Sequence, residues 1–383
     1  MSYDVIVVGG GPAGSAAARA CAENGLSTIC IEEQGTIGYP VQCAGLLSNM
    51  AFDECRVSAR SVLNTVNGAR VVSGSGNSVL IDAKEKKASV IDRAVLDREM
   101  AESAANAGAE YRLKTIVYGI QNSQVLTRGM HGPEEFTFKI LIAADGPRST
   151  VARLYGMQRA RVYFSGIQTD LVHECDPRFV ELYPDVSPEF FGWMIPTGEG
   201  RIRVGLCGND QVKERFSSFL KKIGGVSSLH LVTGTLPLGI MPRTYGHRTL
   251  FVGDAAGFAK PTSGGGVYTG IRTARHAAEV ATAACEQDRY DDKFLAQYEQ
   301  RWQTDIGREL SLGFRLLRLR QHLTSDDIDG LLTSINDPSI LEAIVKYGDM
   351  DRPGKLVSML VKKPALLRWL SPLLVPGIKS LFS

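Results

Sequence analysis

The sequence predicts an α/β fold in which a parallel sheet with flanking helices is joined to a second, β-rich region and to a helical C-terminal region. Three observations lead to this prediction. The chain opens with a strand-like apolar run, a glycine-rich turn, an Ala-rich helical segment and a second apolar run. Several segments between 162 and 235 have strand character, and apolar residues recur at helical spacing from Asp291 onward.

The composition is that of a globular protein with more than one structural unit. The 383 residues are 44% hydrophobic and carry a net charge of +2, which gives no overall bias toward nucleic acid. The seven cysteines are scattered and contain no Cys-x-x-Cys pair, so we expect no disulfide framework, no metal site and a reducing, cytoplasmic compartment. No run of about 18 apolar residues occurs, and residues 3–8 lead straight into glycines, so we expect neither a membrane-spanning helix nor a signal peptide.

The first element is a strand followed by a glycine-rich turn and a helix. Residues 4–8 form a short β-branched apolar run, which is typical of a buried parallel strand. Gly9, Gly11 and Gly14 then make the pattern G-x-G-x-x-G. An Ala-rich, helical segment follows at 15–24. The first glycine allows a tight turn, the second lets the backbone approach a pyrophosphate, and the third lets the helix pack closely on the sheet, with its N-terminus facing the anion.

An acidic residue ends the second strand. Residues 27–31 are apolar and lead into Glu32, which lies 18 residues beyond Gly14. An acid in this place accepts hydrogen bonds from the ribose hydroxyls of an adenine dinucleotide. Glu33 is expected to point away, because side chains alternate along a strand. The order strand, turn, helix, strand and acid predicts a dinucleotide-binding βαβ unit rather than an ordinary glycine-rich turn.

A second glycine-rich strand end favours FAD over NAD as the dinucleotide. Residues 249–252 read as a strand that ends at Gly-Asp-Ala-Ala, and the run PTSGGG then opens a long Ala-rich helix. Asp254 can accept hydrogen bonds from ribityl hydroxyls. The N–H groups of Gly265, Gly266 and Val267 can face the pyrimidine edge of a flavin, where the helix dipole would stabilise the anionic reduced form. The alternative is an ordinary strand–loop–helix with a capping aspartate.

These motifs resemble those of the p-hydroxybenzoate hydroxylase-type FAD superfamily. The likeness rests on the first glycine pattern, on Ala-Asp-Gly at 144–146 after a strand at 139–143, and on Gly-Asp-Ala-Ala at 253–256. The segment VIDRAVLD at 90–97 also resembles the one in which an arginine approaches the cofactor, here Arg93. The resemblance implies an α/β fold with an FAD-binding Rossmann-like domain, whose cofactor-binding residues would be Gly9, Gly11, Ala13, Gly14, Glu32, Cys43, Ala44, Arg93, Val117, Asp254, Gly265, Gly266 and Val267.

Two positions in these motifs have simpler interpretations. Asp145 can serve as a turn residue that supports the sheet instead of binding a ligand. Arg93 lies four residues before Asp97 on a predicted helix, where the two side chains can form an ion pair without any cofactor. The sequence leaves both alternatives open.

Two further stretches point to one branch of this superfamily. The first is GYPVQCAGLLS at 38–48, a loop bounded by Gly and Pro that leaves the second strand at the sheet edge where ligands bind. The second is FFGWMIP at 190–196, in which alternation along a strand would place Phe191, Trp193 and Ile195 on one face. Over roughly residues 1–300 the chain resembles the geranylgeranyl reductases, including the digeranylgeranylglycerophospholipid reductases, which are flavoenzymes that saturate isoprenoid double bonds.

This resemblance implies roles for residues in both stretches. The reductases have a similar Pro-Val-x-Cys stretch beside the flavin, so Cys43 is a candidate catalytic residue near the isoalloxazine; the alternative is a buried apolar cysteine. Their Tyr-x-Trp-x-Phe-Pro motif is matched imperfectly, because Phe191 replaces the tyrosine and Ile195 the phenylalanine. An aromatic floor suits a long hydrocarbon, and an ordinary sheet core is the alternative. The predicted substrate-binding residues are Phe191, Trp193, Ile195 and Pro196.

Strands between the motifs predict a second sheet and set the domain boundaries. Residues 162–171, 201–206 and 229–235 have strand character, and we expect them to roof the flavin and to wall a substrate tunnel. The predicted units are an FAD-binding domain of 1–60, 88–155 and 243–290, a β-rich substrate domain of 61–87 and 156–242, and a C-terminal helical lid of 291–383.

The C-terminal tail is basic and rich in leucine. Residues 353–383 contain no Asp or Glu, and three prolines divide them into pieces too short to span a bilayer. Basic, leucine-rich segments with a tryptophan are typical of helices at a membrane interface, so we expect peripheral contact with the cytoplasmic membrane face. A lid with solvated cations is the alternative. The cations are Lys355, Lys362, Lys363, Arg368 and Lys379.

The combined prediction is an FAD-dependent oxidoreductase of lipid biosynthesis that acts on CH–CH groups of a prenyl lipid. Hydride from reduced flavin would reach one alkene carbon and a proton the other. The sequence has no second G-x-G-x-x-G for a separate NAD(P)H domain, which leaves ferredoxin, a reduced deazaflavin and NAD(P)H open as electron donors. One rival is a flavin-dependent monooxygenase or halogenase, because halogenases have a similar Trp-x-Trp-x-Ile-Pro run. The other rival is a non-enzymatic, FAD-containing prenyl-lipid binding protein.

Overall fold

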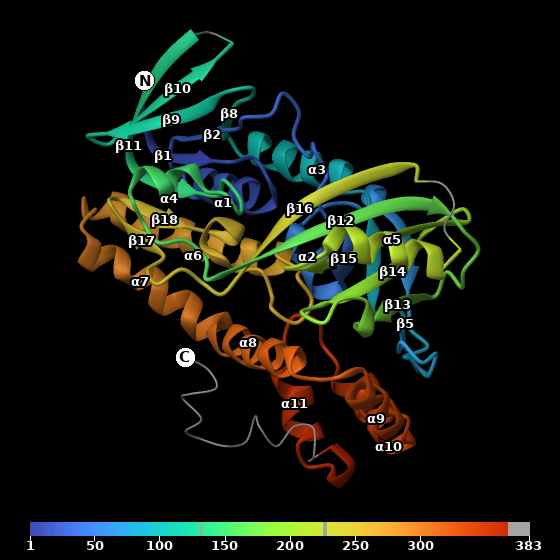
Figure 1. Ribbon diagram of the computed structural model, residues 1–383. Helices are drawn as coiled ribbons and strands as arrows, with labels where there is room; N and C mark the ends of the chain where they lie inside the picture. The colour runs from blue at the N-terminus through green and yellow to red at the C-terminus, as the bar shows by residue number, and fades with distance from the viewer. Residues whose placement is uncertain (131, 225–227, 367–383) are drawn as a thin grey trace.

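The computed structural model describes residues 1–130, 132–224 and 228–366. Three β-sheets and a helical C-terminal region make up this part of the chain (Figure 1). Residues 367–383 lie outside the described residues, and with them Arg368, Lys379 and much of the tail predicted to contact a membrane. Within the described ranges, no helix combines the length and the apolar character that a membrane span requires.

The first sheet holds the predicted dinucleotide-binding unit. Its strand order is β17-β18-β11-β1-β2-β8, with the β9–β10 hairpin attached to β11. β1 pairs in parallel with β2 and with β11, and α1 (Pro12–Glu23) makes the crossover from β1 to β2. The strand bounds are Ser2–Val8 (β1), Thr28–Ile31 (β2), Glu110–Arg112 (β8), Ile116–Gln121 (β9), Gln124–Gly129 (β10), Gly132–Ala143 (β11), Tyr245–Gly246 (β17) and Thr249–Phe251 (β18).

Helices cover this sheet and build one large core with it. α1 packs against α3 (Arg93–Asn106) and α6 (Val267–Glu286). Small side chains allow this close packing, since Ala17 and Ala18 of α1 are completely buried. The predicted order of strand, turn, helix and strand in the first 31 residues is confirmed, and so is the strand followed by a long helix from 249 onward.

The second sheet has two apolar faces with different coverings. Its strands run in the order β16-β12-β15-β14-β13-β5-β6. α5 (Val212–Lys222) covers the outer face, where Phe219 packs with Met194, while Trp193 and Ile195 belong to a separate cluster on the inner face. All three strands predicted in this region are confirmed. The bounds are Gly68–Val72 (β5), Ser78–Asp82 (β6), Val162–Val172 (β12), Phe179–Tyr183 (β13), Phe191–Gly198 (β14), Arg201–Gly208 (β15) and His230–Leu238 (β16).

A small third sheet and the C-terminal helices complete the architecture. In the third sheet, β3 and β4 both pair with β7 in antiparallel fashion. The helical region runs from α7 to α11 and reaches the second sheet, since α9 and α10 contact β6 (Figure 1). The bounds are Leu46–Ser48 (β3), Val62–Val66 (β4), Ala88–Ile91 (β7), Asn49–Cys55 (α2), Thr150–Leu154 (α4), Asp292–Trp302 (α7), Arg308–Gln321 (α8), Ser325–Ile335 (α9), Pro338–Tyr347 (α10) and Gly354–Leu360 (α11).

Candidate functional site

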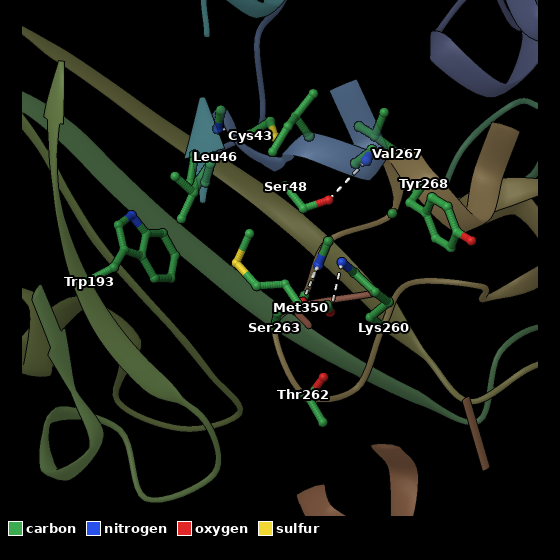
Figure 2. A pocket seen from close by; sticks show the side chains of 18 of the residues that line it. Cys43, Leu46, Ser48, Trp193, Lys260, Thr262, Ser263, Val267, Tyr268 and Met350 are labelled. Atoms are coloured by element: carbon green, nitrogen blue, oxygen red, sulfur yellow. Dashed lines mark hydrogen bonds between the residues drawn. The ribbon is translucent and has the colours of Figure 1, made fainter. Parts of the chain in front are cut away.

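A large cavity lies where the first sheet, the second sheet and the helical region meet. Its volume is about 1120 Å³. The wall includes the glycine-rich turn after β1, the loop that carries Cys43, the inner face of the second sheet and several residues between 348 and 353. Figure 2 shows Cys43, Lys260 and Trp193 on different sides of this space. The cavity therefore brings together both glycine-rich strand ends and the aromatic stretch that the sequence singled out.

The turn after β1 has open space at one of its three motif glycines. A Cβ atom on Gly9 would lie 2.4 Å from the carbonyl oxygen of Ala144, and one on Gly14 would lie 1.8 Å from the carbonyl oxygen of Gly9. A Cβ atom on Gly11 would meet nothing within 4 Å. Gly9 and Gly14 thus allow β1, β11 and α1 to approach closely. Gly11 and Ala13 line the cavity at the N-terminus of α1, where an anion is favoured.

The carboxylate of Glu32 lies at the end of β2 beside this turn. Its Oε2 atom accepts a hydrogen bond from the backbone N–H of Gly10 at 2.6 Å, and its Oε1 atom accepts one from the N–H of Gln34 at 2.8 Å. Glu33 is exposed, as alternation along the strand predicts. Glu32 is not part of the cavity wall, so only an extended ligand that runs past Gly11 would reach it.

Asp254 presents a buried carboxylate at the second glycine-rich strand end. Its Oδ1 atom is shielded from solvent and has no hydrogen-bond partner among the described residues. A Cβ atom on Gly266 would lie 2.6 Å from this oxygen, so the loop can pass only with a glycine here. Burial raises the pKa of Asp254 to about 6, although the charge of Arg93 acts to lower it. An unpaired buried carboxylate of this kind fits a ligand that donates hydrogen bonds, as ribityl hydroxyls do.

The segment between β18 and α6 presents backbone N–H groups to the cavity. We call residues 260–268 the 260-loop; Gly265, Gly266 and Val267 of this loop line the cavity. Gly266 is the N-cap of α6, and no side chain accepts the first N–H groups of this helix. The first N–H groups of α6 and the positive end of its dipole therefore lie at the cavity wall, and their contact with a flavin stays a prediction.

Arg93 forms the predicted ion pair with Asp97 and also lies at the cavity, so its approach to a cofactor stays a prediction. Its Nε and Nη2 atoms donate hydrogen bonds to the two carboxylate oxygens of Asp97, both at 2.9 Å. Arg93 also lines the cavity and lies beside Cys43. Burial opposes its charge, but Asp97 and Cys43 outweigh burial and raise the pKa of Arg93 above its ordinary value. The arginine thus remains charged while it contributes to the cavity wall.

Two side chains of the second sheet hold the loop that carries Cys43. The side-chain amide of Gln168 donates a hydrogen bond to the carbonyl oxygen of Cys43 at 2.9 Å, and Nη1 of Arg203 donates one to that of Ala44 at 3.0 Å. Arg203 is oriented by Asp170, whose Oδ1 atom lies 2.8 Å from its Nε atom. Cys43 is not in a disulfide, and its Sγ atom accepts a hydrogen bond from the N–H of Gly45 at 3.4 Å. The sequence does not reveal Gln168 and Arg203, because each is an ordinary polar residue of an alternating strand.

The aromatic stretch forms one wall of the cavity. Phe191, Trp193 and Ile195 all line it from β14, and the rings of Phe191 and Trp193 meet edge-on with their centroids 6.2 Å apart. The indole ring packs over Gly205, where a Cβ atom would lie 2.5 Å from it. Pro196 is buried but is not part of the wall, since the residue after Ile195 faces the other side of the strand. The predicted alternation is confirmed for the other three residues.

Two other predicted positions have side chains outside the cavity. Val117 lies on β9 and is buried in the core of the first sheet. Asp145 supports a turn, because its Oδ2 atom accepts a hydrogen bond from the N–H of Val151 at 3.0 Å; burial raises the pKa of Asp145. The neighbours Ala144 and Gly146 do line the cavity. For Asp145 the structure therefore shows the turn role and no contact with the cavity.

Taken together, these groups fit a flavin dinucleotide. The N-terminus of α1 can hold a diphosphate, the unpaired Asp254 can accept ribityl hydroxyls, and the N-terminus of α6 can face the polar edge of the ring. The aromatic wall then leaves apolar space next to the ring. Among the described residues, no group of His, Cys, Asp and Glu could hold a metal ion.

Comparisons with known proteins agree with this arrangement. Residues 4–333 match the family model described as lycopene cyclase protein. The chain is 32% identical to digeranylgeranylglycerophospholipid reductase 2 of Methanothermobacter thermautotrophicus, over 98% of this chain and 100% of that protein. It is 28% identical to digeranylgeranylglycerophospholipid reductase of Methanocaldococcus jannaschii, over 97% of this chain and 98% of that one.

Solved structures show the same fold. A geranylgeranyl bacteriochlorophyll reductase-like protein of Thermoplasma acidophilum superposes with a TM-score of 0.84 at 27% identity, over 94% of this chain and 99% of that one. A p-nitrophenol 4-monooxygenase of Pseudomonas putida superposes with a TM-score of 0.73 at 17% identity, over 90% of this chain and 97% of that one. At this lower identity the likeness concerns the fold alone.

Proposed function

Because this chain belongs to the lycopene cyclase protein family and to the digeranylgeranylglycerophospholipid reductases, which are flavin-dependent oxidoreductases, we propose that it is an FAD-dependent reductase of prenyl lipids. The reaction saturates isoprenoid C=C bonds of a geranylgeranyl-type chain. One carbon of each double bond receives a hydride and the other receives a proton. We further propose that the chain divides into an FAD-binding domain, a β-rich substrate domain and a C-terminal helical lid at the boundaries predicted from the sequence.

The observation that carries the proposal is that the residues suited to bind a flavin and an apolar aromatic wall line the same cavity. Asp254 and the 260-loop line it on one side and Trp193 lines it on another. A polar aromatic substrate would need hydrogen-bonding groups on the wall opposite the cofactor. Phe191 and Ile195 offer hydrocarbon surface there, which suits a prenyl chain, and the indole N–H of Trp193 is the donor on this strand that has no partner among the described residues.

The residues of the chain have distinct roles in this mechanism. Bound FAD supplies the hydride-transfer chemistry. Gly11, Asp254 and Gly266 would hold the cofactor through its diphosphate, its ribityl chain and its ring. Trp193 orients the prenyl chain. Gly348, Met350 and Pro353 line the cavity on the side of the helical region, where they would limit the access of water to the reacting groups.

Cys43 is the candidate for the reacting region itself. Its loop is fixed from the second sheet by Gln168, and its thiol lies beside the charged Arg93. We assign to it the shaping of the site next to the flavin. Replacement by alanine should lower the turnover rate while FAD stays bound, because Gly11, Asp254 and Gly266, which would hold the cofactor, form no hydrogen bond with the thiol.

The experiment that tests the proposal starts from the purified protein. Mass spectrometry of its lipid extract identifies the prenyl lipid, and turnover with dithionite-reduced protein then shows its fate. Reduction adds two hydrogens for each double bond lost. An oxygenated or halogenated product would instead support the monooxygenase or halogenase alternative, a cyclised product of unchanged mass would support a cyclase, and a bound lipid that never changes would support a binding protein. Stopped-flow turnover with reduced ferredoxin, deazaflavin and NAD(P)H identifies the donor.

We also propose peripheral contact with the cytoplasmic membrane face through residues 353–383. In the described part of this segment, Lys355 and Lys362 are exposed. Attraction of such cations to anionic lipid is screened by salt. Sedimentation with vesicles should therefore increase with the anionic lipid fraction and decrease with ionic strength. Equal sedimentation with neutral and anionic vesicles would contradict this contact.

A further inference from the structure

A buried cluster of three polar side chains lies at the cavity wall where three distant parts of the chain meet; Ser48 and Lys260 line the cavity, and Asp351 lies behind them. Lys260 belongs to the 260-loop, Ser48 precedes α2, and Asp351 comes from the segment between α10 and α11. The side chain of Asp351 is completely buried, and that of Lys260 is only 11% exposed. Figure 2 shows Lys260 on the side of the cavity opposite Trp193, with Ser48 nearby and the side chain of Met350 extending toward Trp193.

Asp351 is the hub of this cluster. Its Oδ1 atom accepts a hydrogen bond from Nζ of Lys260, and its Oδ2 atom accepts one from the hydroxyl of Ser48. Lys260 also donates to the carbonyl oxygen of Met350 at 3.2 Å. A buried ion pair gains little net stability compared with apolar residues, so its stronger effect is on the geometry of the segments that it joins.

Lys260 is hydrogen-bonded to other residues of the 260-loop. The backbone N–H of Lys260 donates to the carbonyl oxygen of Gly265 at 3.1 Å, and the carbonyl oxygen of Lys260 accepts a hydrogen bond from the N–H of Gly264 at 2.8 Å. Its side chain crosses the same loop, because a Cβ atom on Gly265 would lie 3.0 Å from Cε of Lys260. Lys260 therefore holds the part of the loop whose N–H groups face the cavity.

The next residue of the helical region holds the other end of the 260-loop. Arg352 donates to the hydroxyl oxygen of Tyr268 from Nε at 3.1 Å and from Nη2 at 2.9 Å. Tyr268 is almost completely buried and directly follows Val267. Arg352 is itself paired with Asp305, at 2.9 Å. Two consecutive residues of the helical region thus hold both ends of a loop that belongs to the first sheet.

We propose that Asp351 and Arg352 are positioning residues of the flavin site, through which the helical region holds the 260-loop in its cofactor-binding conformation. This inference rests on the flavin site of the proposed function and goes beyond it. Coupling between two binding events is reciprocal. Docking of the helical region therefore increases FAD affinity, and FAD binding in turn tightens the docking of the helical region.

FAD affinity in solution tests the first half of this coupling. The FAD dissociation constant should rise about tenfold or more in Asp351→Asn and in Lys260→Met, within the range usual for coupled sites. The double variant should lose no more affinity than the weaker-binding single variant, because both changes remove the same link. The matched control is Asp176→Asn, since Asp176 forms its ion pair with Arg178 at the protein surface and not with a residue of the helical region or of the 260-loop. Wild-type affinity in both single variants would overturn the inference.

Amide hydrogen exchange of the wild-type protein tests the second half and needs no variant. The readout is α9, which contributes no residue to the cavity wall as described. Exchange in α9 should slow when FAD is added, and an unchanged rate would overturn the inference even if the variants fail to fold. The proposed function is judged separately: FAD bound with the predicted coupling but no prenyl reduction refutes the reductase alone. Reduction without coupling refutes this inference alone, and failure to take up flavin refutes both.

Discussion

The carboxyl group of Asp254 should couple FAD binding to the loss of a proton. Without cofactor, burial raises the pKa of Asp254 from 3.8 to about 6, against the opposing charge of Arg93. Ribityl hydroxyls that donate to the ionised carboxylate would lower this pKa again. Below pH 6 the carboxyl must lose its proton before FAD can make these bonds. FAD affinity should therefore fall as the pH falls through the raised pKa.

The size of this effect follows from the pKa shift. A rise from 3.8 to about 6 is about two pKa units, or about 3 kcal/mol between the two protonation states. If bound FAD restores the ordinary pKa, the FAD dissociation constant rises about tenfold between pH 7 and pH 5. The same carboxyl gives the cofactor-free protein a stability contribution that is fully present below the unfolded-state pKa and is lost as the pH rises through about 6.

The assay is a fluorescence titration of FAD at constant ionic strength between pH 5 and pH 7. Asp254→Asn keeps the shape of the side chain but cannot ionise, so its FAD affinity should be weaker at pH 7 and nearly independent of pH. A wild-type dissociation constant that does not change with pH would refute the reasoning. The same pH dependence in Asp254→Asn would also refute it, because another group would then be titrating.

The remaining predictions concern packing around the same site. Gly14→Ala should destabilise the protein by about 2–3 kcal/mol and abolish flavin uptake, since the new Cβ atom would lie 1.8 Å from the Gly9 carbonyl oxygen. Thermal melts measure the loss of stability, and flavin absorbance of the purified variant measures cofactor uptake. Trp193→Leu should lower the rate of prenyl-lipid reduction at least several-fold with FAD still bound, while Met194→Leu on the other face of β14 should not lower it. Equal rates in the two variants would contradict the role of Trp193 in substrate binding. Tyr298→Phe should cost about 1–2 kcal/mol in urea unfolding, because the fully buried hydroxyl donates to the last carbonyl of β18 at 2.6 Å; an unchanged midpoint would contradict that bond's contribution.

Local sequence patterns were sufficient for most of the fold. The strand at the start of the chain, the glycine turn and α1 depend on residues that are neighbours in the chain, so their spacing shows the structure directly. The same holds for the alternation of Phe191, Trp193 and Ile195, since side chains two apart on a strand share a face. Pro196 is predicted to bind substrate from the family motif, but it directly follows Ile195, and this odd spacing places it on the other face.

Contacts between distant segments could not be read in the same way. Gln168 and Arg203 look like ordinary strand residues, and their importance appears only where β12 and β15 meet the loop of Cys43. Lys260 lies within a stretch that the sequence marked, but its partner Asp351 is 91 residues away, in the segment between α10 and α11. No short-range pattern records which of many carboxylates will pair with a given lysine across such a distance.

By itself, the sequence determined the dinucleotide-binding unit, the two glycine-rich strand ends and the aromatic strand, because each depends on backbone geometry over a few consecutive residues. Only the tertiary structure decided that these elements enclose one cavity, that Arg93 serves Asp97 and the cavity together, and that the helical region reaches into the wall beside the 260-loop. The physical reason is that burial, charge pairing and the raised pKa of Asp254 arise from how segments far apart in the chain exclude water from one another.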